Sequence, residues 1–273
     1  MRGTLFYKMS GSGNDFVVLD GRASTPEQWS TPLVQAICDR RTGVGADGLV
    51  MLTPKAPELV QMIYWNSDGS MGALCGNAAL CSGRLAVHLE LVQSGEFGLL
   101  TDAGMVRVRS TAGRESVEIK LPDFEAPSSF TAVPLEPGER WMSLVTVGVP
   151  HLVIRVDEIE GVDPLARGRP LRFHQALGPA GANVNFVSEG SRGPWLIRTY
   201  ERGVEGETLA CGTGTVAAAA ALAARGEASL PVRFRSRGGP ELCVSGAVCD
   251  GRVSEAWLGG EGRLVFRGVW EGS

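Results

Sequence analysis

The chain has 273 residues, of which 44% are hydrophobic and 21% are charged, which is enough for one large domain or two medium-sized domains with substantial cores. Lysine and arginine number 26 and aspartate and glutamate 30, and the formal net charge of −4 gives no support to a general nucleic-acid or membrane-surface role. No apolar run is long enough to span a bilayer and the N-terminal segment lacks the core of a signal peptide, so we expect a cytoplasmic protein.

Short apolar segments separated by turns rich in Gly, Asp and Ser predict strands in the first half of the chain. These strands are expected at residues 5–9, 16–20, 48–54, 60–66, 106–111 and 116–122. Two helices are expected among them, one at about residues 28–40 and one directly after Cys75, where the sequence continues as GNAALCSGRLAVHLELV.

The second half repeats this texture after the segment LPDFEAPSSF at 121–130, which predicts a domain boundary near residue 125. Strands are expected at residues 142–148, 151–156, 184–188, 195–201, 232–236, 241–246 and 263–270. A third helix is expected after Cys211, where the Ala-rich sequence GTGTVAAAAALAARG begins.

The helices after Cys75 and Cys211 share three features. Each follows a β-rich stretch, opens on a Cys-Gly pair and continues with few polar residues, which predicts a helix that is buried on all sides. Taken alone, helix 212–224 is also consistent with an ordinary core helix. The matching starts form a weak internal repeat, which predicts two similar domains that face one another.

Six cysteines in a chain of this length do not suggest a disulfide framework, and in a reducing cytosol they are free thiols. The ordinary interpretation of any one of them is a small, buried hydrophobic side chain. The pairs Cys75/Cys81 and Cys243/Cys249 have five intervening residues each, whereas structural zinc sites usually have about two to four, so no metal is expected.

A cysteine at the start of a helix is well placed to react, because the unpaired N–H groups of the first turn and the positive end of the helix dipole favour a thiolate. The same N–H groups bind anions such as a carboxylate, and Gly76, Gly212 and Gly214 let a ligand approach the backbone closely. Two such sites facing each other suit the inversion of an amino-acid α-carbon. One thiolate removes a proton, and a thiol on the opposite face returns one.

Four blocks of the sequence resemble the diaminopimelate epimerase family, whose members act without a cofactor in the synthesis of lysine and cell-wall precursors. The blocks are KMSGSGNDFVVLDG at 8–21, NSDGSMGALCGNAALC at 66–81, GANVNF at 181–186 and YERGVEGETLACGTGT at 200–215. The last block is the most specific. With RRTGVGADGL at 40–49 and VGVPH at 147–151, the resemblance covers nearly the whole chain.

The resemblance implies an α/β fold of two pseudo-symmetric domains, each a curled mixed or antiparallel sheet around a central helix. Residues 1–125 and a returning strand at about 262–273 would form one domain, and residues 126–261 the other. The resemblance also implies an active site in the cleft between the domains, a small amino acid as the partner, no cofactor and a homodimer.

Roles of individual residues follow from the same resemblance. Cys75 and Cys211 are implied to be the two catalytic bases, with His151 and Glu201 close to the thiols. The residues implied to bind substrate are Asn14, Asn66, Gly76, Asn77, Asn183, Glu201, Arg202, Gly212 and Thr213.

Several of these residues have simpler interpretations when they are taken alone. Asn14, within GSGND, favours a turn, and Asn66 before Ser-Asp-Gly also suits one. His151 suits a structural histidine, and Glu201 with Arg202 suits a solvated pair at a strand end. The functional interpretation depends on all of them occurring together in the family's order.

Four positions depart from the family's pattern. Ala78 and Leu80 stand where the usual Cys-Gly-Asn-Gly-Ala-Arg-Cys has glycine and arginine, and Gly48 stands where some members have glutamine. Val149 replaces the asparagine of the usual Gly-Asn-Pro-His, which removes a substrate-binding amide and would cost about 1–3 kcal/mol for a ligand group left unpaired. The acid–base pair is therefore kept while part of the substrate cage is changed.

The first interpretation is epimerisation of LL-diaminopimelate to meso-diaminopimelate. A racemase or epimerase for another amino acid stays open, although Asn77 stands where the related proline and hydroxyproline enzymes usually have histidine. A non-catalytic ligand-binding protein on the same scaffold is the third alternative, and the retention of both Cys75 and Cys211 argues against it.

Overall fold

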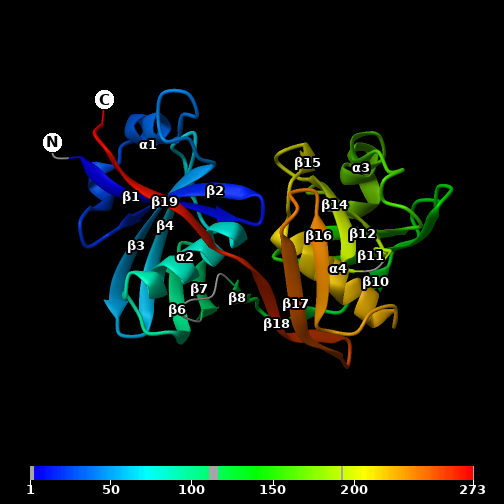
Figure 1. Ribbon diagram of the computed structural model, residues 1–273. Helices are drawn as coiled ribbons and strands as arrows, with labels where there is room; N and C mark the ends of the chain where they lie inside the picture. Colours follow the sequence, from blue (N-terminus) through cyan, green and yellow to red (C-terminus); the bar gives the residue numbers. More distant parts are fainter. Residues whose placement is uncertain (1–2, 111–115, 192, 273) are drawn as a thin grey trace. The chain divides into compact units, whose positions relative to one another are not determined.

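The computed structural model describes residues 3–110, 116–191 and 193–272, and the last residue of the strand expected at 106–111 therefore lies outside the described residues (Figure 1). The chain divides into two compact units, one formed by residues 1–120 with 259–273 and the other by residues 121–258. From the sequence, these boundaries were expected at about residues 125 and 262.

The first unit is a mixed sheet with two α-helices. Its strands pair side by side in the order β19, β1, β2, β3, β4, β6, β7, β8, with the short β5 added to β4. They are β1 (Thr4–Gly11), β2 (Asn14–Asp20), β3 (Gly48–Ala56), β4 (Leu59–Asn66), β5 (Met71–Gly72), β6 (Gly95–Thr101), β7 (Gly104–Ser110), β8 (Ser116–Lys120) and β19 (Arg263–Trp270). The helices are the 3-10 turn η1 (Pro26–Gln28), α1 (Thr31–Cys38) and α2 (Gly76–His88).

The second unit is built in the same way. Its strands are β9 (Phe124–Glu125), β10 (Ser128–Ser129), β11 (Glu139–Val147), β12 (Val149–Val156), β13 (Asn183–Ser188), β14 (Trp195–Glu201), β15 (Gly206–Thr208), β16 (Val232–Ser236), β17 (Glu241–Cys249) and most of β18 (Arg252–Glu261). The helices are α3 (Pro164–Arg172), the 3-10 turn η2 (Gln175–Leu177) and α4 (Gly212–Ala224).

The two units share one strand topology. Along β1, β2, β3, β4, β6 and β7 the successive pairings are antiparallel, parallel, antiparallel, parallel and antiparallel. The series β11, β12, β13, β14, β16 and β17 repeats this order. In both units a helix follows the short strand added to the fourth strand of the series. The expected fold class of two similar α/β domains is therefore confirmed.

A buried helix lies at the centre of each unit (Figure 1). Helix α2 packs against β1 to β4, β7 and β8, and nearly all its residues from Asn77 to Val87 are buried. Helix α4 packs against β11, β12, β13 and β17, and its residues 214–222 are buried. Their apolar sequences, which lack a polar face, therefore reflect burial on all sides. No helix in the described ranges has the length and apolarity needed to span a membrane.

One expectation about the helices was wrong in detail, and one helix was not expected at all. The helix expected at 28–40 is shorter, because the chain forms the separate turn η1 before it and leaves the helical conformation at Asp39. Helix α3 was not expected, because its sequence PLARGRPLR contains two prolines and a glycine. Asp163 starts α3 by accepting hydrogen bonds from the N–H groups of Leu165 and Ala166.

The sheet of the second unit separates two kinds of side chain. On one face of β12, β13 and β14, apolar residues form a core with Leu171 of α3; these are Leu152, Ile154, Val184, Phe186 and Tyr200. Because side chains alternate along a strand, His151, Asn183, Asn185 and Thr199 lie on the opposite face, beside α4. These four polar residues thus lie next to the helix that follows Cys211.

Candidate functional site

Each unit carries a cysteine directly before its central helix. Cys75 precedes α2 and Cys211 precedes α4, with nearly the same extended backbone, φ/ψ of −127°/121° and −132°/109°. The carbonyl group of each accepts a hydrogen bond from the N–H group four residues on, Ala79 for the first and Thr215 for the second, at 2.9 Å. Both thiols therefore lie at the first turn of a helix, where the dipole and the unpaired N–H groups stabilise negative charge.

These two cysteines differ from the other buried ones. Burial raises the pKa of Cys38 to about 11, and burial also raises the pKa of Cys81, which is wholly inside the first unit. Such thiols stay protonated and inert. Cys75 is half-buried and Cys211 is 8% exposed, so both residues are less deeply buried than Cys38 and Cys81.

A chain of hydrogen bonds lies beside the start of α2. Asn77 Nδ2 donates to Asn14 Oδ1 at 2.7 Å, and Asn14 Nδ2 donates to Asp47 Oδ2 at 2.9 Å. Asn77 is 5% exposed, and its Oδ1 has no hydrogen-bond partner among the described residues. A buried acceptor without a partner can receive an N–H group of a ligand. The structure thus brings two sequence-predicted residues, Asn14 and Asn77, together.

Asp47 and Arg40, which the sequence analysis gave no role, hold Asn14 in place. Arg40 donates to Asp47 Oδ1 at 2.7 Å and to Asp15 Oδ1 at 2.6 Å, and Lys8 donates to Asp15 Oδ2 at 2.5 Å. Burial would raise the pKa of Asp15, but the hydrogen bonds from Arg40 and Lys8 outweigh burial and hold that pKa below its ordinary value. Both Arg40 and Asp47 belong to the sequence block 40–49, which was the available signal.

Asn66 and Gly76 take no part in the hydrogen bonds that join Asn77, Asn14 and Asp47. The Asn66 amide donates to Ser70 Oγ at 3.0 Å within the turn between β4 and β5, so this side chain does shape a turn. Within the described ranges no hydrogen bond joins Asn66 to Asn14 or Asn77. A Cβ atom at Gly76 would meet only Ile119 Cδ1, at 3.8 Å, so the space beside this glycine is open.

Three of the four residues that differ from the family's usual pattern are buried inside the first unit. Ala78 and Leu80 are wholly buried in the first unit. The ring of Tyr64 covers Gly48, where a Cβ atom would lie 2.5 Å from Tyr64 Cε2. Val149 is different, because it is half-buried and starts β12, two residues before His151.

On the α4 side of the sheet in the second unit, several residues that were predicted to belong to the site lie close together. Asn183 pairs in register with His151, and Asn183 Oδ1 accepts the backbone N–H of Arg202 at 2.7 Å. Burial, with the nearby positive charge of Arg202, lowers the pKa of His151 to about 3, so this ring is neutral at ordinary pH. Burial raises the pKa of Glu201 above its ordinary value, an effect that Thr208 only partly offsets.

The surroundings of Cys211 are tightly packed. The Thr213 hydroxyl lies 3.8 Å from Cys211 Sγ. A Cβ atom at Gly214 would lie 2.3 Å from Asn185 Oδ1 and 3.1 Å from Cys211 Sγ, so only glycine fits between these two side chains. A Cβ atom at Gly212 would meet the flexible end of Leu258 at 2.9 Å. Asn185 was not predicted as a site residue from the sequence.

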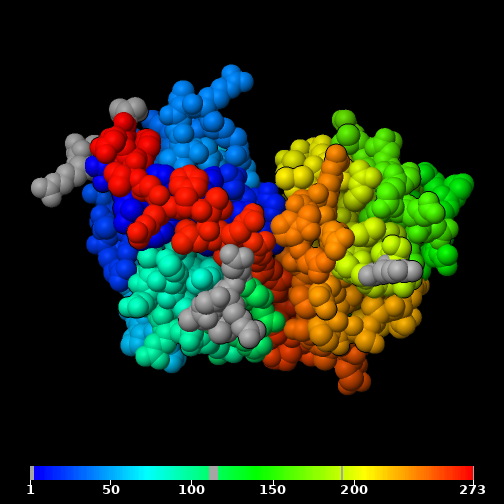
Figure 2. Space-filling view, viewed as in Figure 1, coloured from blue at the N-terminus to red at the C-terminus, as the bar shows by residue number. Residues whose placement is uncertain are grey.

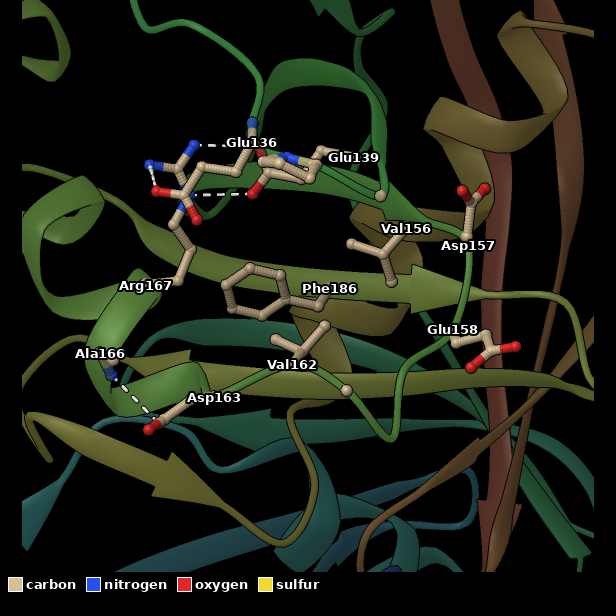
Figure 3. Close-up of a pocket in the computed structure, with 13 residues that line it drawn as sticks. Glu136, Glu139, Val156, Asp157, Glu158, Val162, Asp163, Ala166, Arg167 and Phe186 are labelled. Atoms are coloured by element: carbon tan, nitrogen blue, oxygen red, sulfur yellow. Dashed lines mark hydrogen bonds and ion pairs between the residues drawn. The ribbon is translucent and has the colours of Figure 1, made fainter.

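A cavity of about 700 Å³ in the second unit lies away from these residues (Figure 3). Val156, Val162 and Phe186 form its apolar lining, and Arg167 points toward Glu136 and Glu139 at its edge. Phe186 lies on the α3 side of the sheet, whereas Asn185 lies on the α4 side. None of the residues expected to act on a substrate lines this cavity. In the described ranges no group of three or more His, Cys, Asp and Glu side chains could hold a metal ion.

Comparison with known proteins gives consistent matches over nearly the whole chain. The family model described as diaminopimelate epimerase matches residues 6–121 and 143–248. The diaminopimelate epimerase of Gemmatimonas aurantiaca is 42% identical over 272 residues, covering 96% of this chain and 98% of that protein. The diaminopimelate epimerase of Aquifex aeolicus is 36% identical over 274 residues, covering 96% of both.

A solved structure supports the fold independently. The Bacillus anthracis phenazine biosynthesis protein of the PhzF family superposes with a TM-score of 0.73, covering 98% of this chain and 99% of that chain. Its sequence is only 12% identical, so what the two proteins share is the arrangement of helices and strands.

Proposed function

Because the chain belongs to the diaminopimelate epimerase family, we propose that it interconverts LL- and meso-diaminopimelate, with Cys75 and Cys211 as the two acid–base groups. One observation carries the assignment of the two bases. In two units of the same topology, a cysteine with the same backbone conformation precedes the central helix. The other four cysteines lack this placement.

The chemistry needs one thiolate and one thiol on opposite faces of the substrate's α-carbon. The thiolate takes the α-proton, and the electron pair of the broken C–H bond passes into the carboxylate. N–H groups at the start of the helices stabilise the added negative charge, which replaces the electron sink of a cofactor. The thiol on the other side gives its proton to the carbon. The configuration is then inverted, and the two sulfur atoms have exchanged roles.

The remaining predicted residues hold the substrate in this proposal. Glu201 and Arg202 bind the distal amino-acid group, where a carboxylate and a guanidinium suit an ammonium and a carboxylate. Asn14 and Asn77 form hydrogen bonds with polar atoms of the substrate. The Asn77 Oδ1 atom is buried and lacks a donor among the described residues, and an N–H group of the substrate would supply one. The remaining residues that would bind the substrate are Asn66, Asn183, Gly76, Gly212 and Thr213.

An exchange assay in D₂O tests this function. Proton NMR should show loss of the α-hydrogen signal from both LL- and meso-diaminopimelate, with a rate that EDTA and hydroxylamine leave unchanged. The substrate panel also includes proline, hydroxyproline, glutamate and lysine, because Val149 removes a polar group beside His151 and favours a less polar ligand there. Exchange with one of these amino acids and none with diaminopimelate would make the chain an epimerase of another substrate.

We also propose a homodimer in the cytoplasm. A mechanism with two reduced sulfur atoms requires a reducing compartment, in which disulfides do not persist. Leu5 and Val269 pair directly across strands β1 and β19 and are 46% and 56% exposed, and Val265, farther along β19, is 52% exposed. Figure 2 shows β19 on the surface of the first unit. Val265→Arg should therefore convert a dimer into a monomer in sedimentation velocity, and unchanged sedimentation would contradict this surface.

A further inference from the structure

The buried amide of Asn185 contacts three polar groups on the α4 side of the second unit. Asn185 Nδ2 lies 3.4 Å from the carbonyl oxygen of Leu152 and 3.3 Å from Nδ1 of His151. Asn185 Oδ1 accepts a hydrogen bond from the Thr199 hydroxyl at 3.0 Å. The side chain has no exposed surface, so water does not compete for these contacts.

The Leu152 carbonyl fixes which way the amide faces. A carbonyl oxygen only accepts hydrogen bonds, so the NH₂ group of Asn185 must be the end that faces Leu152. The same NH₂ group faces His151, and its second N–H therefore points to Nδ1. Nδ1 can accept this hydrogen bond only if it carries no proton.

The other ring nitrogen then carries the proton of a neutral imidazole. His151 is wholly buried, and its Nε2 has no hydrogen bond of normal distance and angle among the described residues. A hydrogen bond with the backbone of Val147 raises the pKa of the ring, but burial and the charge of Arg202 outweigh it. A buried Nε2–H group with no acceptor at normal hydrogen-bond distance and angle is costly, and a ligand oxygen would satisfy it.

We propose that Asn185 is a positioning residue that holds His151 in the Nε2–H tautomer, so that the ring offers a neutral N–H donor to a carboxylate oxygen of the substrate. This role rests on the proposed function for its ligand, but the tautomer itself does not. Asn185 also fills the space beside Gly214, so one side chain sets both the histidine and the packing next to Cys211.

Nitrogen NMR of the ligand-free protein measures the tautomer directly. The chain has three histidines, so a sample labelled with ¹⁵N-histidine gives three ring systems, and the variant His88→Gln/His174→Gln leaves only His151. At pH 7 we expect Nδ1 of His151 to show the shift of an unprotonated nitrogen and Nε2 that of a protonated one. An Nδ1–H ring, or an even mixture of the two tautomers, would overturn the proposal without any variant at position 185.

The variant Asn185→Asp tests the cause. A carboxylate accepts but does not donate, so the proton should move to Nδ1 or the ring should become doubly protonated. An unchanged tautomer in folded Asn185→Asp protein, judged by near-UV circular dichroism, would also overturn the proposal. With diaminopimelate, KM should rise at least tenfold in this variant. Wild-type protein that shows the Nε2–H tautomer but no exchange with diaminopimelate would refute the proposed function alone.

Discussion

Alanine at position 214 would place a methyl group where two side chains of the second unit already lie. The added Cβ atom would stand 2.3 Å from Asn185 Oδ1 and 3.1 Å from Cys211 Sγ. Carbon and oxygen atoms in ordinary contact are roughly 3.5 Å apart, so the Asn185 amide or the first turn of α4 must move by about 1 Å. The amide is buried and held by Thr199 and Leu152, so the movement disturbs those hydrogen bonds.

The expected magnitudes follow from this displacement. Forcing a methyl group into a packed interior costs about 1–3 kcal/mol, and the gain from replacing glycine in a helix is at most about 1 kcal/mol. A net loss of about 1–2 kcal/mol lowers Tm by roughly 2–8 °C at about 2–4 °C for each kcal/mol. A 1 Å displacement of a catalytic group can cost about 100-fold in rate, so kcat should fall by about that factor.

Two matched variants distinguish the steric displacement at position 214 from the general effect of replacing a glycine with alanine. At Gly212 the nearest atom is the flexible end of Leu258, so Gly212→Ala should keep the Tm of the wild type. At Gly161 the nearest atom is a carbonyl oxygen 3.9 Å away, so Gly161→Ala should keep both Tm and activity. A Gly214→Ala protein with the Tm and kcat of Gly161→Ala would refute the positions given to Asn185 and Cys211. The corresponding position of α2 is already the buried Ala78, so alanine is not excluded from such a helix start in general.

Three further predictions concern pH, substrate binding and oxidation. The folded pKa of His151 is about 3, below the ordinary 6.5, so the unfolded state takes up a proton first as pH falls, and stability should drop by about 2 kcal/mol between pH 6 and 4.5. Urea unfolding of His151→Gln should lack that part of the loss, and an identical pH dependence would contradict a buried neutral ring. Asp47→Ala should raise KM for diaminopimelate about tenfold by releasing the Asn14 amide, whereas the exposed control Asp102→Ala should not, and equal KM values would count against the role of Asp47. Mild oxidation should inactivate the enzyme reversibly through a disulfide between Cys75 and Cys211, detected as a linked peptide by mass spectrometry; full activity after oxidation would speak against two thiols at one substrate.

The central helices and their cysteines could be predicted because the signals are local. A Cys-Gly pair followed by an uninterrupted apolar run is visible in a short window, and both helices begin at the expected residues, Gly76 and Gly212. Strands β6 and β18 were not predicted, because GEFGLLT and RVSEAWLGGE mix glycines and charges with apolar residues. Strand β6 pairs with the adjacent β7 and with β4, and β18 pairs with the distant β9, so pairing with neighbouring strands rather than local residue preference makes them strands.

The side chains that hold the predicted site residues, such as Asp47 and Asn185, could not be predicted, because their contacts join distant parts of the sequence. Asn14 meets Asp47 across 33 positions and Asn77 across 63. Asn185 meets His151 across 34 positions and Thr199 across 14. The alternation in GANVNF, with Asn183 and Asn185 two residues apart, was the one local sign that both amides lie on the same face of a strand.

Isomer-specific exchange by single-cysteine variants tests the two-base proposal most directly. Cys75→Ala and Cys211→Ala should each lose epimerisation, because one face of the α-carbon then has no thiol. The remaining thiolate can still remove a proton and return deuterium on the same face. We therefore expect each variant, incubated in D₂O with LL- or meso-diaminopimelate, to exchange the reacting α-hydrogen of one isomer without inversion, and the two variants to act on opposite isomers. Cys249→Ala, at an exposed position, should exchange and invert both isomers. Epimerisation at an undiminished rate by either single variant, or exchange of the same isomer by both, would contradict the account.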